Sequence, residues 1–372
     1  MTRRFVAALL SLGACSLAAA QPQYTVEVIG GIEPSSPSGL LSLPLGINNN
    51  GRVVGYTSTA TSPTYILNWK IGSIYPTPPP AGSSLSYGSK VNIRGRIAGA
   101  SYTLDQGGQV TAARAIRWYG RQPQDLGTLG GSTSVGLGIN DYDHIVGYST
   151  VTGEAVTKAF VWQESTGMVP LASPSGATET YAYDISNSDI IVGTAASQAS
   201  PAKPYMWANG AVTQLPIPTG SRTGGASAVN NAGVSVGTYE IDQFLGTFAA
   251  VRWEAGQMFE LGNLGGSYPY AKASDINNLG QIVGTSNSAN GYTGFLWMNG
   301  TMYDLRSLLA PEFGSIEITS AGAINERGQI AAGAIINGRT TAVLLNPIAF
   351  APTPGSMVVL AVAGLAVLRR RR

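Results

Sequence analysis

Side chains that could carry out catalysis are scarce in this chain. Its 372 residues include one histidine, His144, and one cysteine, Cys15. With no second histidine, a histidine-rich metal site is excluded, and a Ser-His-Asp triad would need this one imidazole. His144 lies in a predicted turn where the equivalent segments of the chain carry Arg, Gln, Val or Ile. This position favours an exposed turn residue over a catalytic base.

Paired carboxylates are the catalytic device that the composition still allows, because a glycosidase needs only two acids within about 5–10 Å of each other. Four acids in predicted long connections are candidates for a polysaccharide hydrolase or lyase: Asp105, Glu154, Glu240 and Asp242. Three tyrosines in such connections are candidates for contacts with a glycan: Tyr102, Tyr268 and Tyr270. Most loop residues of these types simply face solvent. We therefore expect no catalytic residue, no cofactor and no bound metal.

The elements that must position these residues come from one internal repeat. Seven segments follow a common pattern of Asn, Gly and β-branched residues, and they begin 44 to 48 residues apart, the span of one four-stranded propeller blade. They are INNNGRVVG from Ile47, VNIRGRIAG from Val91, INDYDHIVG from Ile139, ISNSDIIVG from Ile185, VNNAGVSVG from Val229, INNLGQIVG from Ile276 and INERGQIAA from Ile324.

Each segment predicts a strand, a tight bulged turn and a return strand. The second position is Asn six times and Ser once, which suits the start of a type I turn, where the side chain accepts a local backbone hydrogen bond. The fifth position is Gly five times and Asp twice (Asp143 and Asp189), and both types tolerate a left-handed backbone. One copy, DINNLG from Asp275, resembles a calcium loop, but it has Leu279 at the fifth position and lacks the acid at the twelfth.

A tryptophan follows six of the seven segments, 13 to 19 residues after the segment ends, and predicts a buried anchor for each blade. These residues are Trp69, Trp118, Trp162, Trp207, Trp253 and Trp297, with Leu344 or Leu345 near the same place in the seventh unit. A second turn and a fourth strand come next, as in MFELG from Met258.

The fourth strand of the last unit is missing at its expected place but has a counterpart near the start of the chain. Residues Tyr24–Gly31, YTVEVIGG, match the fourth strand that begins at Met258. We therefore expect an all-β, seven-bladed β-propeller over residues 24–346, with the last blade closed by the N-terminal strand 24–30. Six or eight blades, or a linear β-solenoid, are the alternatives; a solenoid would need caps, and none is evident.

These units resemble the HAF-repeat extracellular proteins. Asp125–Trp162 and Glu260–Trp297 are close examples of that repeat, and the resemblance covers about Tyr24–Asn346. The histidine for which the family is named is absent here, because Lys158 precedes Ala159 and Phe160. The resemblance implies a place outside the cell and brings no catalytic role with it.

The first twenty residues are typical of a secretory signal peptide. Arg3 and Arg4 precede an apolar run that ends at Ala20 in a site suited to signal peptidase. The alternative is a lipoprotein signal with Cys15 as the lipidated residue. Cleavage at Ala20 would leave a protein without cysteine, which must depend on a large core instead of disulfides.

Residues 351–372 are typical of a C-terminal sorting signal. A polar motif (Pro352, Thr353, Pro354, Gly355 and Ser356) precedes a short apolar segment and four arginines (Arg369, Arg370, Arg371 and Arg372). The apolar residues 357–368 would rise only about 18 Å as a helix, which favours a transient or weak membrane association over a stable transmembrane helix. An ordinary weak tail anchor is the alternative.

This layout resembles the PEP-CTERM signals of Gram-negative bacteria, which an exosortase-like enzyme processes. Six of the 22 basic residues lie in the two terminal signals and none of the 20 acids does, so the body carries a net charge of about −4, which argues against nucleic acid. The sequence thus predicts a secreted, non-enzymatic propeller at the cell surface or in extracellular polysaccharide, with a structural or adhesive role. A glycan-binding propeller and a carboxylate-dependent hydrolase or lyase are the alternatives.

Overall fold

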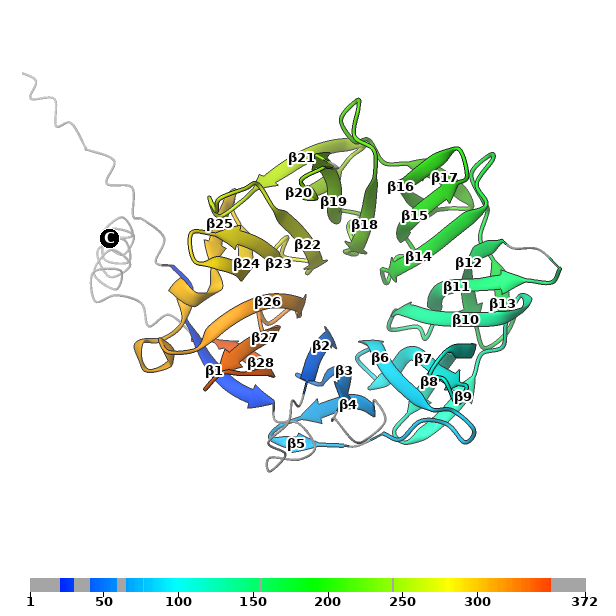
Figure 1. Cartoon of the computed structure of the whole chain (residues 1–372), viewed down its shortest axis with the longest axis horizontal. Helices are drawn as coiled ribbons and strands as arrows, with labels where there is room; N and C mark the ends of the chain where they lie inside the picture. The colour runs from blue at the N-terminus through cyan, green and yellow to red at the C-terminus, as the bar shows by residue number, and fades with distance from the viewer. Residues whose placement is uncertain are drawn as a thin grey trace, which may run out of the picture. The chain divides into compact units, whose positions relative to one another are not determined.

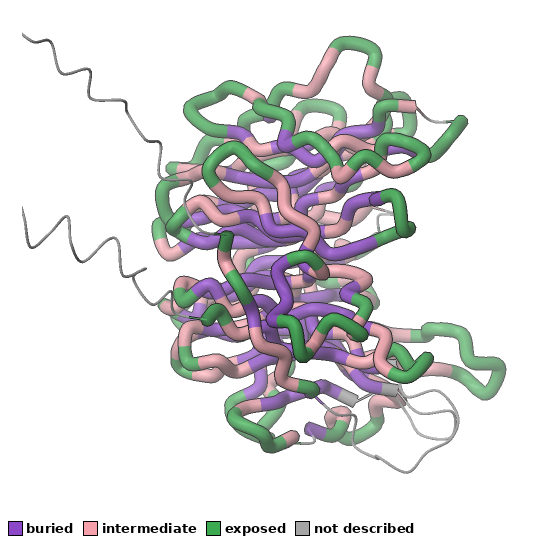
Figure 2. Tube along the Cα trace, turned by 90° about the vertical axis from the view of Figure 1, so that its left-hand side faces the viewer, coloured by how far each residue is buried: buried purple, intermediate pink, exposed green. Residues whose placement is uncertain are grey.

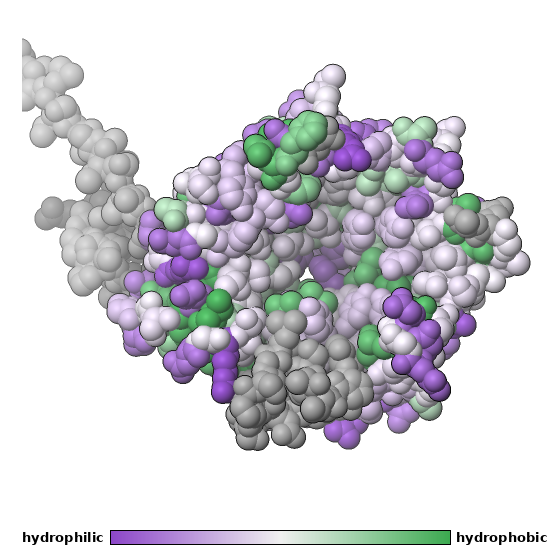
Figure 3. Space-filling view, viewed as in Figure 1, coloured by the Kyte–Doolittle hydropathy of each residue, from purple (hydrophilic) through white to green (hydrophobic). Residues whose placement is uncertain are grey.

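The computed structural model describes residues 21–29, 41–58, 65–75, 77–153, 156–242 and 244–348. Within them, Tyr24–Pro347 forms one compact unit of antiparallel sheets arranged in a ring (Figure 1). The space-filling view shows an opening at the centre of this ring, here called the central channel (Figure 3). Buried residues run through the strands, and exposed residues gather in the connections (Figure 2). The predicted propeller fold is confirmed. The signals predicted over 1–20 and 351–372, including Cys15 and the sorting motif, lie outside the described residues.

The described strands sort into seven groups of four, here called blades 1 to 7. Blade 1 is β2 (Leu41–Ile47), β3 (Val53–Ser58), β4 (Tyr65–Lys70) and β5 (Ser73–Ile74); blade 2 is β6 (Leu85–Val91), β7 (Arg96–Leu104), β8 (Val110–Tyr119) and β9 (Gln122–Asp125); blade 3 is β10 (Gly130–Ile139), β11 (Ile145–Val151), β12 (Thr157–Gln163) and β13 (Gly167–Pro170); blade 4 is β14 (Glu179–Ile185), β15 (Ile191–Ser197), β16 (Ser200–Ala208) and β17 (Ala211–Gln214).

Blade 5 is β18 (Gly224–Val229), β19 (Ser235–Asp242), β20 (Thr247–Glu254) and β21 (Gln257–Gly262); blade 6 is β22 (Ala271–Ile276), β23 (Ile282–Ser288), β24 (Gly291–Met298) and β25 (Thr301–Asp304); blade 7 is β26 (Glu317–Ile324), β27 (Ile330–Ile336), β28 (Arg339–Pro347) and β1 (Tyr24–Ile29). Two short 3₁₀ helices, η1 (Leu305–Leu308) and η2 (Pro311–Phe313), connect blades 6 and 7. Blades 2, 3 and 4 merge into one larger sheet through single parallel pairs, Thr133 with Ala113 and Thr157 with Glu179.

The N-terminal strand closes the ring, as its sequence predicts. β1 pairs antiparallel with β28 over six residues, from Tyr24 with Pro347 to Ile29 with Ala342. The closing strand ends at Ile29, one residue before the predicted end at 30, and residue 30 is not described. Because this pairing covers the outer edge of β28, the ring is closed and the linear solenoid is not formed.

The repeated turn has the predicted geometry in every copy. The fifth position has a positive φ in all seven, including the two aspartates, Asp143 at 70° and Asp189 at 55°. In the copy from Ile276, the side-chain oxygen of Asn277 accepts the backbone N–H groups of Leu279 and Gln281 at 3.1 and 3.0 Å. The Asn side chain therefore supplies the local bond that fixes the turn.

Five of the six tryptophans are buried between blades, as expected. Trp118 and Trp253 are almost fully buried, and the indole N–H of Trp253 donates to the carbonyl of Pro216 at 2.6 Å. Trp297 differs because it is only half-buried, with the guanidinium of Arg252 5.6 Å from its ring centre. Leu345 takes the tryptophan's place in blade 7, where it pairs with Ile330 and is fully buried.

Candidate functional site at the centre of the ring

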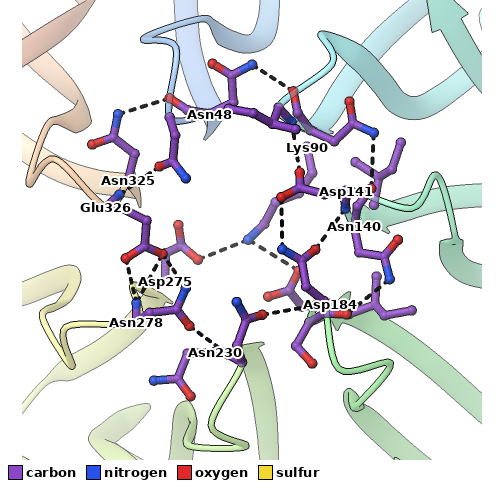
Figure 4. Close-up of a pocket in the computed structure, with 18 of the residues that line it drawn as sticks. Asn48, Lys90, Asn140, Asp141, Asp184, Asn230, Asp275, Asn278, Asn325 and Glu326 are labelled. Atoms are coloured by element: carbon purple, nitrogen blue, oxygen red, sulfur yellow. Dashed lines mark hydrogen bonds and ion pairs between the residues drawn. The ribbon is translucent and has the colours of Figure 1, made fainter.

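The candidate site is built from the next-to-last residue of each innermost strand. In all seven blades a β-bulge precedes this residue, and a bulge re-aims the side chain that follows it. From blade 1 to blade 7 the residues alternate between small and charged, so that two small residues meet where blade 7 adjoins blade 1: Gly46, Lys90, Gly138, Asp184, Ala228, Asp275 and Ala323. Three charged side chains thus face one another from blades 2, 4 and 6 (Figure 4).

The small residues in this series make room for the neighbouring blade. A Cβ placed on Gly46 would lie 2.9 Å from the Cα of Lys90, and one on Gly138 would lie 2.9 Å from the Cα of Asp184. Real Cβ atoms do not approach backbone that closely. Glycine is therefore a packing requirement at these two positions, whereas Ala228 and Ala323 have room for a Cβ.

Lys90 links the two aspartates across the channel. Its Nζ lies 3.0 Å from Oδ1 of Asp275 and 3.4 Å from Oδ1 of Asp184. The second oxygen of each carboxylate accepts a backbone N–H from the following blade, from Val229 to Asp184 at 3.1 Å and from Ile324 to Asp275 at 3.0 Å. Each carboxylate is therefore held on both oxygens.

Burial and mutual charge set the protonation of this cluster. Burial alone would lower the pKa of Lys90, but the carboxylates of Asp184 and Asp275 outweigh it and raise that pKa, so the amine is charged. Burial raises the pKa of Asp184, the ammonium of Lys90 opposes that rise, and the negative charge of Asp275 adds to it. With all three groups ionised, one ammonium shared by two carboxylates gives the cluster a net charge of −1.

A ring of Asn side chains lies at the same end of the channel. Six of the seven turn-starting residues are Asn, and the side-chain amide of each donates to the carbonyl of its counterpart in the next blade at 2.7 to 3.2 Å. The last of these bonds, from Asn325 to the carbonyl of Asn48, joins blade 7 to blade 1. Ser186 stands at the seventh position, and its shorter side chain has no such bond to blade 5 among the described contacts.

A second ring of bonds involves the residue after each of these. A backbone N–H at this position is accepted by the next blade's side chain, as from Asp141 to Asn187 at 2.9 Å and from Glu326 to Asn49 at 2.9 Å. Ile93 interrupts this ring because its side chain has no acceptor for Asn49. Together the two rings tie each turn to its neighbour.

These groups surround a cavity of about 150 Å³ at the turn end of the channel. Hydrophilic residues are visible deep within the central opening (Figure 3), and the lining is mainly Asn, Asp, Lys and backbone. Among the described residues, no three His, Cys, Asp or Glu side chains are grouped to hold a metal ion. The Lys90 ammonium lies between the two carboxylates and pairs with both. An acid-base reaction would need one of these groups to be free.

The sequence did not single out Lys90 or Asp184, and it treated Asp275 only as part of a turn motif. The sequence instead places its candidate acids and tyrosines in the longer connections between strands. A signal does exist in the sequence, since every copy can be aligned and the residue before each motif's first position can be read as a column. That column alternates in size and charge, whereas the same position in an ordinary sheet would not.

The structure separates the tyrosines that the sequence grouped as glycan contacts. Tyr102 of blade 2 stacks on Tyr87, with ring centres 5.9 Å apart. Tyr268 and Tyr270 lie together beside blade 6, where both contact Tyr292, and the hydroxyls of Tyr268 and Tyr292 are 2.6 Å apart. Sequence analysis missed Tyr292, which completes this Tyr268–Tyr270–Tyr292 patch.

Lys272 is also part of the surroundings of this patch. Its Nζ lies 3.8 Å from the ring centre of Phe248 and 5.4 Å from that of Tyr270, and burial lowers its pKa. The hydrogen bond between the hydroxyls of Tyr292 and Tyr268 raises the pKa of Tyr292 to about 12. The patch thus presents aromatic edges, hydroxyls and one cation on the long-connection side of blades 5 and 6.

The candidate acids fall into different places. The carboxylate of Asp105 accepts the backbone N–H groups of Gly107 and Gln109, so it fixes its own turn. Glu154 lies outside the described residues. Glu240 and Asp242, in contrast, line one pocket of blade 5 together with Arg222.

His144 is less exposed than expected. Its side chain is 22% exposed, and its Nδ1 lies 2.7 Å from a carboxylate oxygen of Asp189 in the next blade. It therefore joins the turns of blades 3 and 4, which agrees with a turn role and gives it a structural partner.

Comparison with known proteins finds structural similarity at low sequence identity. No protein-family model and no curated protein matches this chain. Among solved structures, YCF48 bound to D1 peptide is 9% identical with a TM-score of 0.48, and the match covers 90% of this chain and 99% of that one. TolB from Acinetobacter baumannii is 13% identical with a TM-score of 0.43, covering 88% and 97%. SapL1 lectin in complex with alpha methyl fucoside is 14% identical with a TM-score of 0.40, covering 72% and 95%.

A search for membrane spans finds no helix, within the described ranges, that is both long and apolar enough to cross a bilayer. The apolar segment 357–368, for which the sequence predicts a weak membrane association, is not among those ranges.

Proposed function

We propose that this protein is a secreted, non-enzymatic propeller with a structural or adhesive role at the cell surface or in extracellular polysaccharide. The observation that carries this proposal is the pairing of the charged side chains at the centre of the ring. The charged groups at this centre form ion pairs with one another, between Lys90 and both Asp184 and Asp275. The two carboxylates also accept backbone N–H groups of adjacent blades. Groups held in this way stabilise a ring and are not free to attack a substrate.

The sequence supports the location. An N-terminal segment typical of a signal peptide and a C-terminal segment similar to a PEP-CTERM signal both point to export, with signal peptidase and an exosortase-like enzyme as processing partners. The short apolar segment 357–368 would contact the membrane only weakly or during export. Extracellular polysaccharide is the expected surrounding material.

Fractionation of bacteria that produce the tagged protein tests this proposal. We expect the body on the cell surface or in the extracellular matrix, without residues 1–20 and without the arginine tail. Replacement of Arg369–Arg372 by serine should reduce delivery to that place, while the ring still folds. Recovery of wild type in the cytoplasm with both ends intact would contradict the proposal.

A glycan-binding role is the second candidate, because the structure brings Tyr268 and Tyr270 together with Tyr292. Tyrosine rings offer apolar faces for sugar C–H groups and hydroxyls for sugar oxygens. Tyr268 and Tyr292 are 37% and 45% exposed, so a polymer can reach them. Retention on immobilised polysaccharide, reduced by Tyr292→Ala and not by Tyr142→Ala in a distant turn, would support this role.

A further inference from the structure

The pocket of blade 5 that contains Glu240 is separate from the channel cluster. It is a cavity of about 450 Å³ lined by Gly220, Arg222, Glu240, Ile241, Asp242 and Phe244. Gly220 and Arg222 come from the connection that precedes β18, and the other four residues come from the end of β19 and the β19–β20 hairpin, on the side of the ring with the longer connections. Its members have no part in the interblade rings described above.

Glu240 is the feature of this pocket that calls for a ligand. Its side chain belongs to a residue that is only 9% exposed, and its Oε2 is buried with no hydrogen-bond partner among the described residues. A buried carboxylate oxygen without a donor costs free energy, and native structures rarely leave one in that state. The missing partner must be a hydrogen-bond donor.

Asp242 has a different task in the same pocket. Its Oδ1 accepts the backbone N–H groups of Phe244 and Leu245 at 2.8 and 3.2 Å. These bonds fix the backbone that carries the Phe244 ring, which is 90% exposed. An exposed aromatic ring on a backbone held by hydrogen bonds offers a flat apolar surface at the mouth of the pocket.

Arg222 supplies the third kind of contact. Its guanidinium is a charged donor, and among the described residues it forms no ion pair. The nearby Lys203 ammonium is occupied by the backbone carbonyls of Ser221 and Arg222, both at 2.8 Å, and so holds this connection in place.

We propose that this pocket binds a saccharide unit. A sugar ring presents neighbouring hydroxyls that donate to Glu240, oxygens that accept from Arg222, and an apolar C–H face that packs on Phe244. A simple amine would satisfy Glu240 but would be repelled by Arg222 and would leave Phe244 exposed. This pocket would be a second glycan-binding place on the ring, separate from the tyrosine patch. Its biological meaning rests on the glycan-binding role proposed above.

Binding rather than hydrolysis is the role assigned to the two carboxylates. Hydrolysis needs one acid to donate a proton and the other to act as base or nucleophile. Asp242 is engaged by two backbone N–H groups, and its work is to hold the hairpin. Glu240 alone remains for the ligand, which is sufficient to accept hydroxyl hydrogen bonds.

The test uses the exported body of the protein, first on an array of neutral and acidic oligosaccharides and then with the best oligosaccharide in a calorimetric titration. We expect Glu240→Gln and Phe244→Ala each to weaken binding tenfold or more, on the order of the loss of one charged hydrogen bond or one stacking face. Glu312→Gln and Leu245→Ala are the matched controls, since both side chains are exposed and outside the pocket lining. A melting curve of each variant verifies that it folds.

Four results would overturn the assignment. Unchanged affinity in both pocket variants, with loss in Tyr292→Ala, would move glycan binding to the tyrosine patch and leave the second candidate function intact. Displacement of the oligosaccharide by methylammonium at equal concentration would make the site a cation pocket. Release of new reducing ends by wild type, abolished in Glu240→Gln, would make the pair catalytic. If the array shows no binder, both the pocket proposal and the glycan-binding candidate fail, while the structural role stands.

Discussion

Lys90 in blade 2 and Asp275 in blade 6 lie 185 residues apart in the chain, and their side chains meet across the central channel at 3.0 Å. The same ammonium also reaches Asp184 in blade 4. Three blades that share no strand pairing with one another are thereby joined at the axis. The cluster acts on the closed ring as a whole rather than on any single sheet.

Removal of the ammonium should be costly. We expect Lys90→Met to lower the free energy of unfolding by about 3 kcal/mol, because two buried carboxylates lose their counter-charge. Denaturation by urea, followed by tryptophan fluorescence, measures the change. The control is Arg114→Met, whose pair with Asp125 is exposed and spans 3.7 Å, and which should cost less than about 1 kcal/mol.

The triple variant Lys90→Met, Asp184→Asn and Asp275→Asn separates charge from packing. It should regain most of the stability that Lys90→Met loses, because no unpaired charge remains. A triple variant no more stable than the single one would show that Lys90 acts by packing alone.

The ring of Asn side chains has a natural gap at Ser186, which allows a second prediction. Asn325 fixes its own turn and also donates to the carbonyl of Asn48, so Asn325→Ala should cost about 2 kcal/mol. Ser186→Asn supplies the amide that blade 4 lacks and should add about 1 kcal/mol. Thermal unfolding of both variants beside wild type checks the signs. The idea is lost if Ser186→Asn destabilises the ring while Asn325→Ala leaves it unchanged.

Backbone strain can be tested at two turns with opposite substitutions. Gly280 has φ of 75° and open space around its missing Cβ, so Gly280→Ala should cost about 1–2 kcal/mol from conformation alone. Ala255 already has φ of 49°, and Ala255→Gly should be neutral or stabilising by up to about 1 kcal/mol. Equal melting temperatures for Gly280→Ala and wild type would refute the geometric account of the turn.

Alkaline pH should weaken the fold. Burial raises the pKa of Tyr24, Tyr148 and Tyr239 to about 12, above the ordinary value of 10.0. The folded state therefore holds these protons more tightly than the unfolded state, and the stability they contribute below pH 10 is lost as pH rises from about 10 toward 12. The raised pKa of Lys90 acts in the same direction above about 10.5.

Ultraviolet titration of tyrosinate together with melting temperature measures this effect. Tyr148→Phe should remove one of the late-titrating groups and reduce the slope of stability against pH above 10. Tyr142→Phe, at an exposed tyrosine, is the control for the substitution itself. Titration of all tyrosines in one step near pH 10 would contradict the prediction.

The sequence predicts the ring well because the same residue types recur wherever the backbone of each blade needs them. Gly280 and Asp143 both occupy the left-handed position, and each residue type reveals that conformation by itself. The pairing of β1 with β28 could be inferred because one fourth strand was missing and one spare strand remained. Residue types therefore indicate the local backbone geometry, and the number of strands in each unit indicates how the ring closes.

The channel cluster could not be predicted in the same way. Lys90 and Asp275 have no common local pattern, and their contact depends on where seven bulges direct seven side chains. The orphaned carboxylate oxygen of Glu240 likewise depends on three-dimensional burial that no spacing reveals. The distance between Tyr102 and the Tyr268–Tyr270–Tyr292 patch has the same cause. Which blades lie next to each other depends on how the ring closes, and residue type does not report it.

The pairing of Thr25 with Asn346, bridged by a side-chain hydrogen bond across 321 positions, orders the events of folding. Six blades consist of consecutive strands and can form as the chain emerges, whereas blade 7 must wait for β28 before β1 has a partner. Contacts of such long sequence separation form slowly. During synthesis the first strand to emerge is therefore the last to be paired. Until β28 follows it, the nascent protein is an open array with two unprotected edges, vulnerable to association with other copies or to proteases.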